Sequence, residues 1–220
     1  VANTLPGMIT SLNIEVSNAS SSIEVEATDA TPPVITINSP QARDYTRLEI
    51  LAVDTASTDS GTGVLLHQVS FDDKIISNGD SVDLFFEHLG AHNVKVTSTD
   101  FVGNTAVSNT EFRIIATASS TIADIERAYN LGWITKEEIE DELRRDLLRI
   151  IKIEEQVDVL KEKLKNKPKV IKQIEQAEKV IDRILEKQLL RNVIRFHKKG
   201  WLNTQAYNLL VEDVNWLLNN

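Results

Sequence analysis

The sequence predicts a multidomain β-plus-α chain, with an antiparallel β-sandwich over residues 31–117 and an antiparallel helical bundle of two long and two short helices over 118–220. Three observations support this prediction. Short runs of alternating apolar and polar residues, separated by turn residues, recur as far as residue 114 and are typical of strands. At residues 117–120 the composition changes from Ser, Thr, Val and Gly to Lys, Glu, Ile and Leu. Beyond that point apolar residues recur every three or four positions, which is the period of a helix.

Composition excludes several classes of function. The chain has 220 residues and no cysteine, so it has no disulfide, no thiolate metal site and no cysteine nucleophile. Residues 1–117 carry 5 Lys and Arg against 15 Asp and Glu, whereas residues 118–220 carry 19 against 18, so the net charge of −9 divides into −10 and +1. Because an acidic surface repels phosphates, we do not expect a nucleic acid partner. No apolar run is long enough to predict a membrane span.

Residues 1–30 contain two alternating runs around a small polar turn, which predicts a β-hairpin. A lone hairpin cannot bury a core, so we expect it to end a preceding β-module or to add strands to the next one. Pro32 and Pro33 follow and stiffen the chain, which indicates a domain junction.

About seven short strands make up the predicted sandwich. They cover residues 34–37, 47–53, 64–70, 74–76, 81–84, 92–98 and 106–114. The last two flank the turn Thr99–Thr105, in which Asp100, Gly103 and Asn104 are turn-forming residues. This pattern predicts a β-hairpin with Val94 and Val96 on one face.

Four segments of this region resemble the immunoglobulin-like repeats of bacterial secreted and cell-surface proteins. They read T-P-P-V-I-T-I-N-S-P at 31–40, D-S-G-T-G-V at 59–64, D-D-K-I-I-S-N-G-D at 72–80 and T-D-F-V-G-N-T at 99–105. The resemblance covers residues 31–117. It implies an Ig-like spacer or adhesive module without a catalytic role, usually one of several in tandem, in an extracellular or cell-surface location.

The helical half is predicted to begin with a short helix from Ile122 to Asn130. Thr135-Lys136-Glu137-Glu138 has the form of a capping box and should open a long helix, which ends near Pro168. A second long helix follows. The apolar face of this second long helix is predicted to contain Ile171, Ile174, Ala177, Ile181, Ile184, Leu190, Ile194 and Phe196. A short helix closes the chain. Each pair of helices is joined at a Gly-Trp dipeptide, which suggests an internal duplication.

Two segments around these dipeptides resemble the FIMAH-type helical module found near the C-termini of large secreted bacterial proteins. They read Y-N-L-G-W-I-T-K-E-E-I and L-R-N-V-I-R-F-H-K-K-G-W-L-N-T-Q-A-Y-N-L-L-V-E-D-V-N-W-L-L, and Ala206, Leu209 and Leu210 match the family pattern. The resemblance covers residues 119–220 and implies no activity that could be transferred.

Acidic residues in the loops of the β-region are candidate calcium ligands. Ca²⁺ takes six to eight oxygen ligands, which clustered loop carboxylates and carbonyls can supply. Asp29 and Asp100 are the first choices, followed by Asp54 and Asp59. The simpler interpretation is that these aspartates cap turns and solvate loops. We predict no other cofactor.

The histidines do not suggest catalysis. His88 and His92 lie four residues apart beside Glu87, but Gly90 between them indicates a turn, so we expect surface residues and not a zinc site. His67 and His197 are isolated in the sequence, and no hydrolase, metalloprotease or phosphate-loop motif is present. We therefore predict a chain that is not an enzyme.

Trp133, Trp201 and Trp216 allow two interpretations. Flat aromatic rings stack on sugars, so the three could form a platform of a carbohydrate-binding module. Tryptophans that follow glycine at helix ends more often close a small bundle, because each buries a large apolar area.

We expect a non-catalytic C-terminal region of a bacterial exported cell-surface protein, with an Ig-like spacer and a helical docking or assembly module, as in a surface layer or filament. Its expected partners are other copies of itself or other cell-envelope proteins, with polysaccharide as a further candidate. Accessory domains of a large secreted hydrolase and a carbohydrate-binding module are the alternatives.

Overall fold

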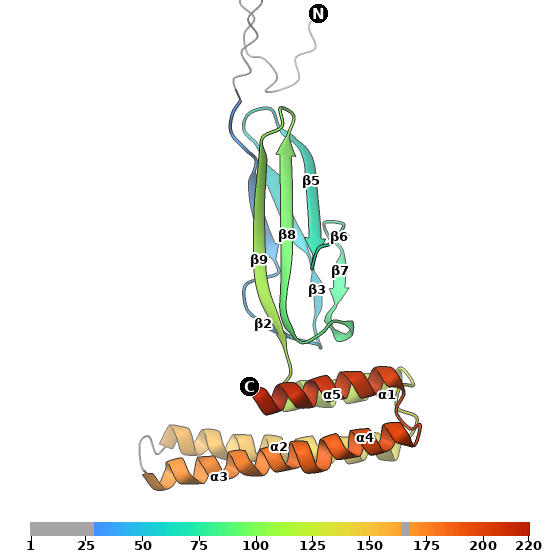
Figure 1. Cartoon of the computed structure of the whole chain (residues 1–220). Coiled ribbons are helices and arrows are strands. Elements are labelled where there is room, and N and C mark those ends of the chain that lie inside the picture. Colours follow the sequence, from blue (N-terminus) through green and yellow to red (C-terminus); the bar gives the residue numbers. More distant parts are fainter. Residues whose placement is uncertain (1–28, 164–167) are drawn as a thin grey trace, which may run out of the picture. The chain divides into compact units, whose positions relative to one another are not determined.

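The computed structural model describes residues 29–163 and 168–220 and has the predicted fold class, a β-sandwich region followed by a helical bundle (Figure 1). The hairpin predicted for residues 1–30 lies almost entirely outside the described residues. The chain divides into two compact units. Unit 1 holds the described residues up to 43 together with 51–82 and 91–112, and unit 2 holds 44–50, 83–90 and 113–220. The domain boundaries at 31 and 118 stay predictions.

The described residues of the β-region form nine strands. They are β1 (Val34–Ser39), β2 (Asp44–Thr46), β3 (Ile50–Ala52), β4 (Asp54–Thr58), β5 (Val64–Phe71), β6 (Lys74–Ile76), β7 (Ser81–Asp83), β8 (Gly90–Asp100) and β9 (Thr105–Ile115). One sheet has the order β2-β9-β8-β5-β6, and the pairs β1-β4 and β3-β7 form two-stranded sheets. β2 pairs in parallel with β9, whereas β1 with β4 and β5 with β8 are antiparallel.

The predicted hairpin around Asp100 is confirmed as β8 and β9, which lie side by side as long strands (Figure 1). Alternation along β8 places Val94 and Val96 in the core with no exposed surface. Ser98 and Asp100 continue on the same face and are also fully buried. Because the alternation continues to the end of β8, the carboxylate of Asp100 lies in the interior beside the turn.

Two strands differ from the prediction. The apolar run at 47–53 is divided into β2 and β3, with Arg47 buried between them. β4 was not predicted, because hydroxyl groups occupy its inward positions. The hydroxyls of Thr55 and Ser57 lie 2.8 Å from Nε2 and Nδ1 of His67. This polar interior lacks the apolar alternation by which a strand is detected in sequence.

The helices are α1 (Ala118–Asn130), α2 (Glu137–Lys163), α3 (Pro168–Ile184), η2 (Leu185–Leu189, a π-helical segment), α4 (Leu190–Lys198) and α5 (Thr204–Asn219). α1 begins four residues before the predicted start, because Thr117 and Ser120 form a reciprocal capping box. The hydroxyl of Thr135 instead donates to the carbonyl of Trp201 at 3.3 Å, and α2 begins at Glu137.

α3, η2 and α4 follow one another without a break and correspond to the predicted second long helix. The π-helical turn changes which residues face the core. Leu185, Leu189 and Val193 are buried, although none was predicted to be, whereas Ile171 is 51% exposed. A π-helical turn contains extra residues and so rotates the following helix relative to the preceding one.

The two Gly-Trp turns have the same geometry. Gly132 and Gly200 have φ of 72° and 71°, the left-handed conformation that ends a helix. The amides of Trp133 and Trp201 each donate to a carbonyl of the preceding helix, at 2.9 and 3.0 Å. The turns also pair with each other through an antiparallel bridge between Ile134 and Leu202. This symmetry agrees with the internal duplication suggested by the sequence.

Candidate functional site

Three of the four candidate calcium ligands converge in unit 1. Carboxylate oxygens of Asp29, Asp59 and Asp100 all lie within 4.8 Å of one another. Asp29 precedes β1, Asp59 follows β4 and Asp100 ends β8, so three distant segments supply the cluster. No salt bridge in the described part of the chain neutralises these carboxylates. Three close oxygen donors of this kind could hold a hard cation such as Ca²⁺.

Hydrogen bonds lower the pKa of two carboxylates of the cluster, Asp29 and Asp100. The hydroxyl of Thr31 at 2.7 Å, together with the amides of Thr31 and Thr62, lowers the pKa of Asp29 to about 2. Burial alone would raise the pKa of Asp100, but donors from Asn104 and from the amides of Val102 and Gly103 outweigh it and lower that pKa. Both carboxylates are therefore anionic at neutral pH.

Asp54 does not belong to this cluster. It begins β4 and is paired in register with Ser39. The sequence placed it in a loop, whereas the structure places it at the start of a strand with an exposed side chain.

Two residues that support the cluster were not singled out from the sequence. Gly61 lies so close to Asp29 that a Cβ atom there would meet its carboxylate at 2.1 Å. Thr62 donates to Asp29 from its amide at 2.8 Å and from its hydroxyl at 3.0 Å. Both lie in the D-S-G-T-G-V segment, whose small residues were the available signal.

A second polar cluster lies in unit 2 around Arg47. Its side chain is 1% exposed, and it pairs with Asp213 and Glu212 of α5. Nε of Arg47 also donates to the carbonyl of Glu87 at 3.1 Å. Glu212 in turn accepts from the amide of Leu89 at 2.9 Å. These bonds join segments 44–50 and 83–90 to α5.

Arg127 of α1 makes the reverse connection. It forms a two-bond pair with Asp83, in which Nη1 lies 3.0 Å from Oδ1. Its guanidinium also lies 4.4 Å from the centre of the Phe85 ring, in a cation–π contact. Arg47, which lies between two strands, thus binds helix α5, and Arg127 of helix α1 binds Asp83 at the end of a strand.

Two buried carboxylates face this arginine cluster. Asp213 is fully buried and Asp124 is 1% exposed. One oxygen of each has no hydrogen-bond partner within the described residues. Burial raises the pKa of Asp124 to about 7, an effect that the charges of Arg47 and Arg127 partly offset. Burial likewise raises the pKa of Asp213 well above its ordinary value.

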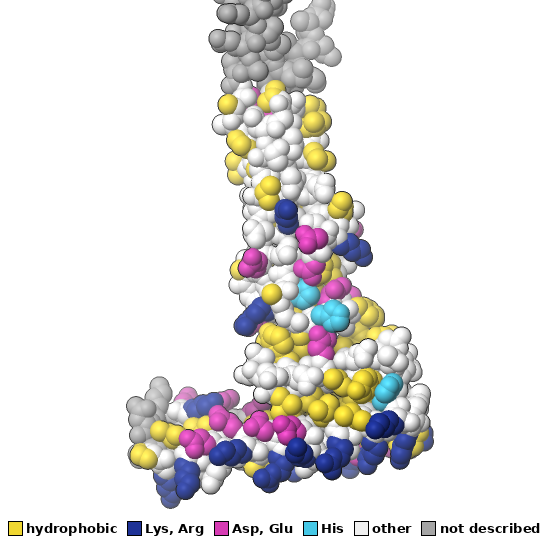
Figure 2. Space-filling model, in the orientation of Figure 1, with side chains coloured by type: hydrophobic (Ala, Val, Ile, Leu, Met, Phe, Trp, Pro, Cys, Tyr) yellow, Lys and Arg dark blue, Asp and Glu magenta, His cyan; other side chains and the backbone are white. Residues whose placement is uncertain are grey.

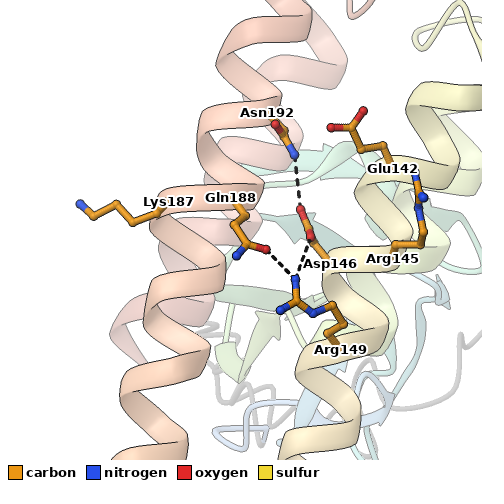
Figure 3. Close-up of a pocket in the computed structure, with 7 residues that line it drawn as sticks. All are labelled: Glu142, Arg145, Asp146, Arg149, Lys187, Gln188 and Asn192. Atoms are coloured by element: carbon orange, nitrogen blue, oxygen red, sulfur yellow. Dashed lines mark hydrogen bonds and ion pairs between the residues drawn. The ribbon is translucent and has the colours of Figure 1, made fainter.

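The pocket in Figure 3 lies between α2 and the η2–α4 segment and has a volume of about 370 Å³. Its polar groups mostly bind one another: Arg149 donates to Gln188 at 2.7 Å, and Asn192 donates to Asp146 at 3.4 Å. Lys187 points away from the pocket (Figure 3). The π-helical turn thus supplies side chains to a polar seam that joins two helices.

The histidines are divided between different surroundings. His88 is 91% exposed, as predicted, but the expectation that His92 lies on the surface is wrong. Its ring is buried, stacks on Phe71 and Phe112, and lies with Nδ1 2.5 Å from Asp72. The strand period turns His92 inward on the same face as Val94. The ring nitrogens of His67 contact hydroxyl groups and not a carboxylate.

Trp133 and Trp201 pack against the core of the bundle. The ring of Trp133 lies 5.4 Å from that of Phe85. Trp201 contacts Phe196 at 5.8 Å and lies under the ammonium groups of Lys136 and Lys199, at 4.3 and 4.4 Å. Trp216 is half-buried on α5. Within the described residues no ring contact joins the three tryptophans.

Comparison with known proteins gives few matches. No protein-family model matches the chain, and no curated protein matches it by sequence. Among solved structures, it is similar to the fibronectin(III)-like modules of Clostridium thermocellum CbhA, with 12% sequence identity and a TM-score of 0.33. The match covers 45% of this chain and 57% of that chain, so the chain spans a little over half of this neighbour's length. Across residues 29–163 and 168–220, no helix has the length and apolar character needed to cross a membrane.

Proposed function

We propose that the chain is a non-catalytic accessory region of a bacterial exported protein, in which the Ig-like β-sandwich is a spacer and the helical bundle is a docking or assembly element. A location at the cell surface and the FIMAH-type character of the helices belong to this proposal. A calcium ion bound at Asp29, Asp59 and Asp100 would stiffen the spacer.

The reciprocal arginine pairs are the observation that carries the proposal. Arg47 and Arg127 are charged groups of the kind that active sites use, but their donors bind carboxylates, a carbonyl and an aromatic face of the same unit. In the polar seam of Figure 3, Arg149 binds Gln188 and Asn192 binds Asp146. The chemistry of unit 2 is thus used to fix segments 44–50 and 83–90 to the helices, which suits a structural part.

Sedimentation velocity of the intact chain over a wide concentration range tests the assembly role. We expect reversible oligomers whose proportion rises with concentration. Co-sedimentation with bacterial cell-envelope fragments tests docking, and co-sedimentation with insoluble polysaccharide tests the tryptophan alternative. A chain that stays monomeric and pellets with no envelope fragment would contradict the proposal.

Binding to polysaccharide that is lost when Trp133, Trp201 and Trp216 are replaced by Ala would favour the carbohydrate-binding alternative. Replacement of Leu131, an exposed residue beside the first Gly-Trp turn, provides the control.

A further inference from the structure

A groove of about 670 Å³ lies on the helical bundle, between α2, α3 and the end of α5. Its apolar lining consists of Val157, Ile181, Leu217 and Leu218. Val157 is 6% exposed, and the other three pack at the edge of the bundle core. The groove therefore offers an apolar surface that continues from the core to the outside.

Four carboxylates border this apolar lining. Glu154 and Asp158 come from α2, and Glu178 and Asp182 come from α3. All four side chains are exposed, and within the described residues none takes part in an ion pair. Lys161 is the basic residue that lines the groove. Figure 2 shows acidic side chains in a row along the helical region, with Lys and Arg gathered along its edge.

The acidic residues on each wall repel one another. Glu154 and Asp158 are four positions apart on one helix, as are Glu178 and Asp182, and like charges at this spacing destabilise a helix. Although Glu154 is exposed, neighbouring atoms partly desolvate its carboxylate, and this desolvation, followed by the charge of Asp158, raises its pKa. A cationic partner would relieve this repulsion on both walls.

The groove does not suit other classes of ligand. Within the described residues, Asp29, Asp59 and Asp100 are the one group of three or more such side chains close enough together for a metal ion, so no three of the groove acids converge on one ion. None of the lining residues is aromatic, so no ring is available to stack on a sugar. Negative charge on both walls repels nucleic acid.

We propose that this groove binds a basic amphipathic helix of another protein, with apolar side chains on Val157, Ile181, Leu217 and Leu218 and with Lys or Arg beside the four carboxylates. The proposal rests on the docking role of the helical bundle. From Glu154 to Lys161 the wall of the groove extends for about two helical turns, or about 10 Å. An amphipathic partner helix would contact this wall over about two of its turns and places cations on both flanks of its apolar stripe.

The test uses the intact chain and an 18-residue peptide of Leu and Lys with one apolar face, measured by fluorescence anisotropy at two salt concentrations. A peptide of the same composition but scrambled sequence is the control. We expect the amphipathic peptide to bind at least tenfold more tightly than the scrambled one. Its binding should weaken as the salt concentration rises.

Asp158→Asn with Asp182→Asn should weaken binding by at least tenfold, while far-UV circular dichroism stays unchanged. Glu162→Gln with Glu175→Gln removes the same charge from exposed positions of the same helices outside the groove and should alter binding by less than twofold. Leu218→Asn should weaken binding without changing its dependence on salt.

Equal binding of both peptides, or equal loss in both double variants, would overturn the proposal. Oligomers of the chain that form without peptide affinity would also overturn it, but would leave the assembly role intact. Oligomers that dissociate in the Asp158→Asn, Asp182→Asn variant and bind no peptide would show that a second copy, and not a basic helix of another protein, occupies the groove.

Discussion

At the scale of single residues, Arg47 and Asp213 form a buried pair whose partners depend on each other. Arg47→Met leaves the fully buried carboxylate of Asp213 without its cation, and breaking a buried pair by removing one partner costs about 3–5 kcal/mol. We therefore expect Arg47→Met to reduce the free energy of unfolding by about that amount. The double variant Arg47→Met, Asp213→Leu should lose less than this single variant, because the carboxylate that remains, that of Glu212, is partly exposed. Urea denaturation measures the free energy of unfolding of the single and double variants. A loss in the double variant that equals the sum of the losses in the two single variants would contradict the assignment of a buried pair.

Asp124 should make stability depend on pH. Its pKa is raised from 3.8 to about 7, so between these values the folded protein keeps a proton that the unfolded chain has lost. The unfolding free energy should therefore fall as pH rises through this window. Asp213, whose pKa is also raised, contributes with the same sign. Asp124→Asn should make the free energy of unfolding depend less on pH in this window. Denaturation curves at several pH values check this prediction. Parallel profiles for the variant and the wild type would be the contrary result.

The calcium hypothesis also belongs to single residues. Excess Ca²⁺ should raise the melting temperature of the intact chain above that in EDTA, because the cation relieves repulsion among three carboxylates. Asp59→Asn should abolish the increase. Asp54→Asn removes the same charge outside the cluster and should preserve it. An equal melting temperature in calcium and in EDTA would remove the hypothesis.

The sequence identified part of this residue-scale chemistry. Asp29 and Asp100 were predicted as the first choices for calcium ligands because they are acidic residues in loops and turns of the β-region. Arg47 was not identified, since it lies in an apolar run that reads as one strand and its partners on α5 are distant in sequence. Burial of a charge depends on tertiary contacts that a local pattern does not contain.

At the scale of elements, the two Gly-Trp turns should respond alike to substitution. Gly132 and Gly200 have positive φ, and a Cβ atom there is strained even where space is free. Gly132→Ala and Gly200→Ala should each lower the free energy of unfolding by about 1–2 kcal/mol, the cost of the left-handed conformation for a residue with a Cβ atom. The chemical denaturation midpoint measures this. A large loss in one variant and none in the other would argue against equivalent turns.

Element types were predictable from the sequence, but their ends and faces were less so. Helical periodicity predicted two long and two short helices, and the structure has them. The π-helical turn at Leu185–Leu189 was not predicted, because it changes the facing residues without changing helical composition. β4 was missed for a different reason, since its inward positions hold polar residues, the buried Thr55 and the half-buried Ser57.

At the scale of the whole molecule, the two compact units do not follow the order of the strands and helices along the sequence. Segments 44–50 and 83–90 contain β2 and the loops that follow β2 and β7, yet they belong to the unit that contains the helices. A change of composition at residue 117 marks where the helices begin, but it does not show which segments between strands pack with the helices. The proposed role as a passive structural region depends on this unit behaving as one.

Native-state hydrogen exchange of the intact chain tests that claim most directly. The amides of Leu84, Glu87 and Leu89 are hydrogen-bonded within unit 2 and can be followed together with those of α1 and α5. We predict that they open with the same free energy as the helices, and that Arg47→Met lowers the protection of all of them together. Loop amides that exchange freely while α1 and α5 stay protected would contradict the account.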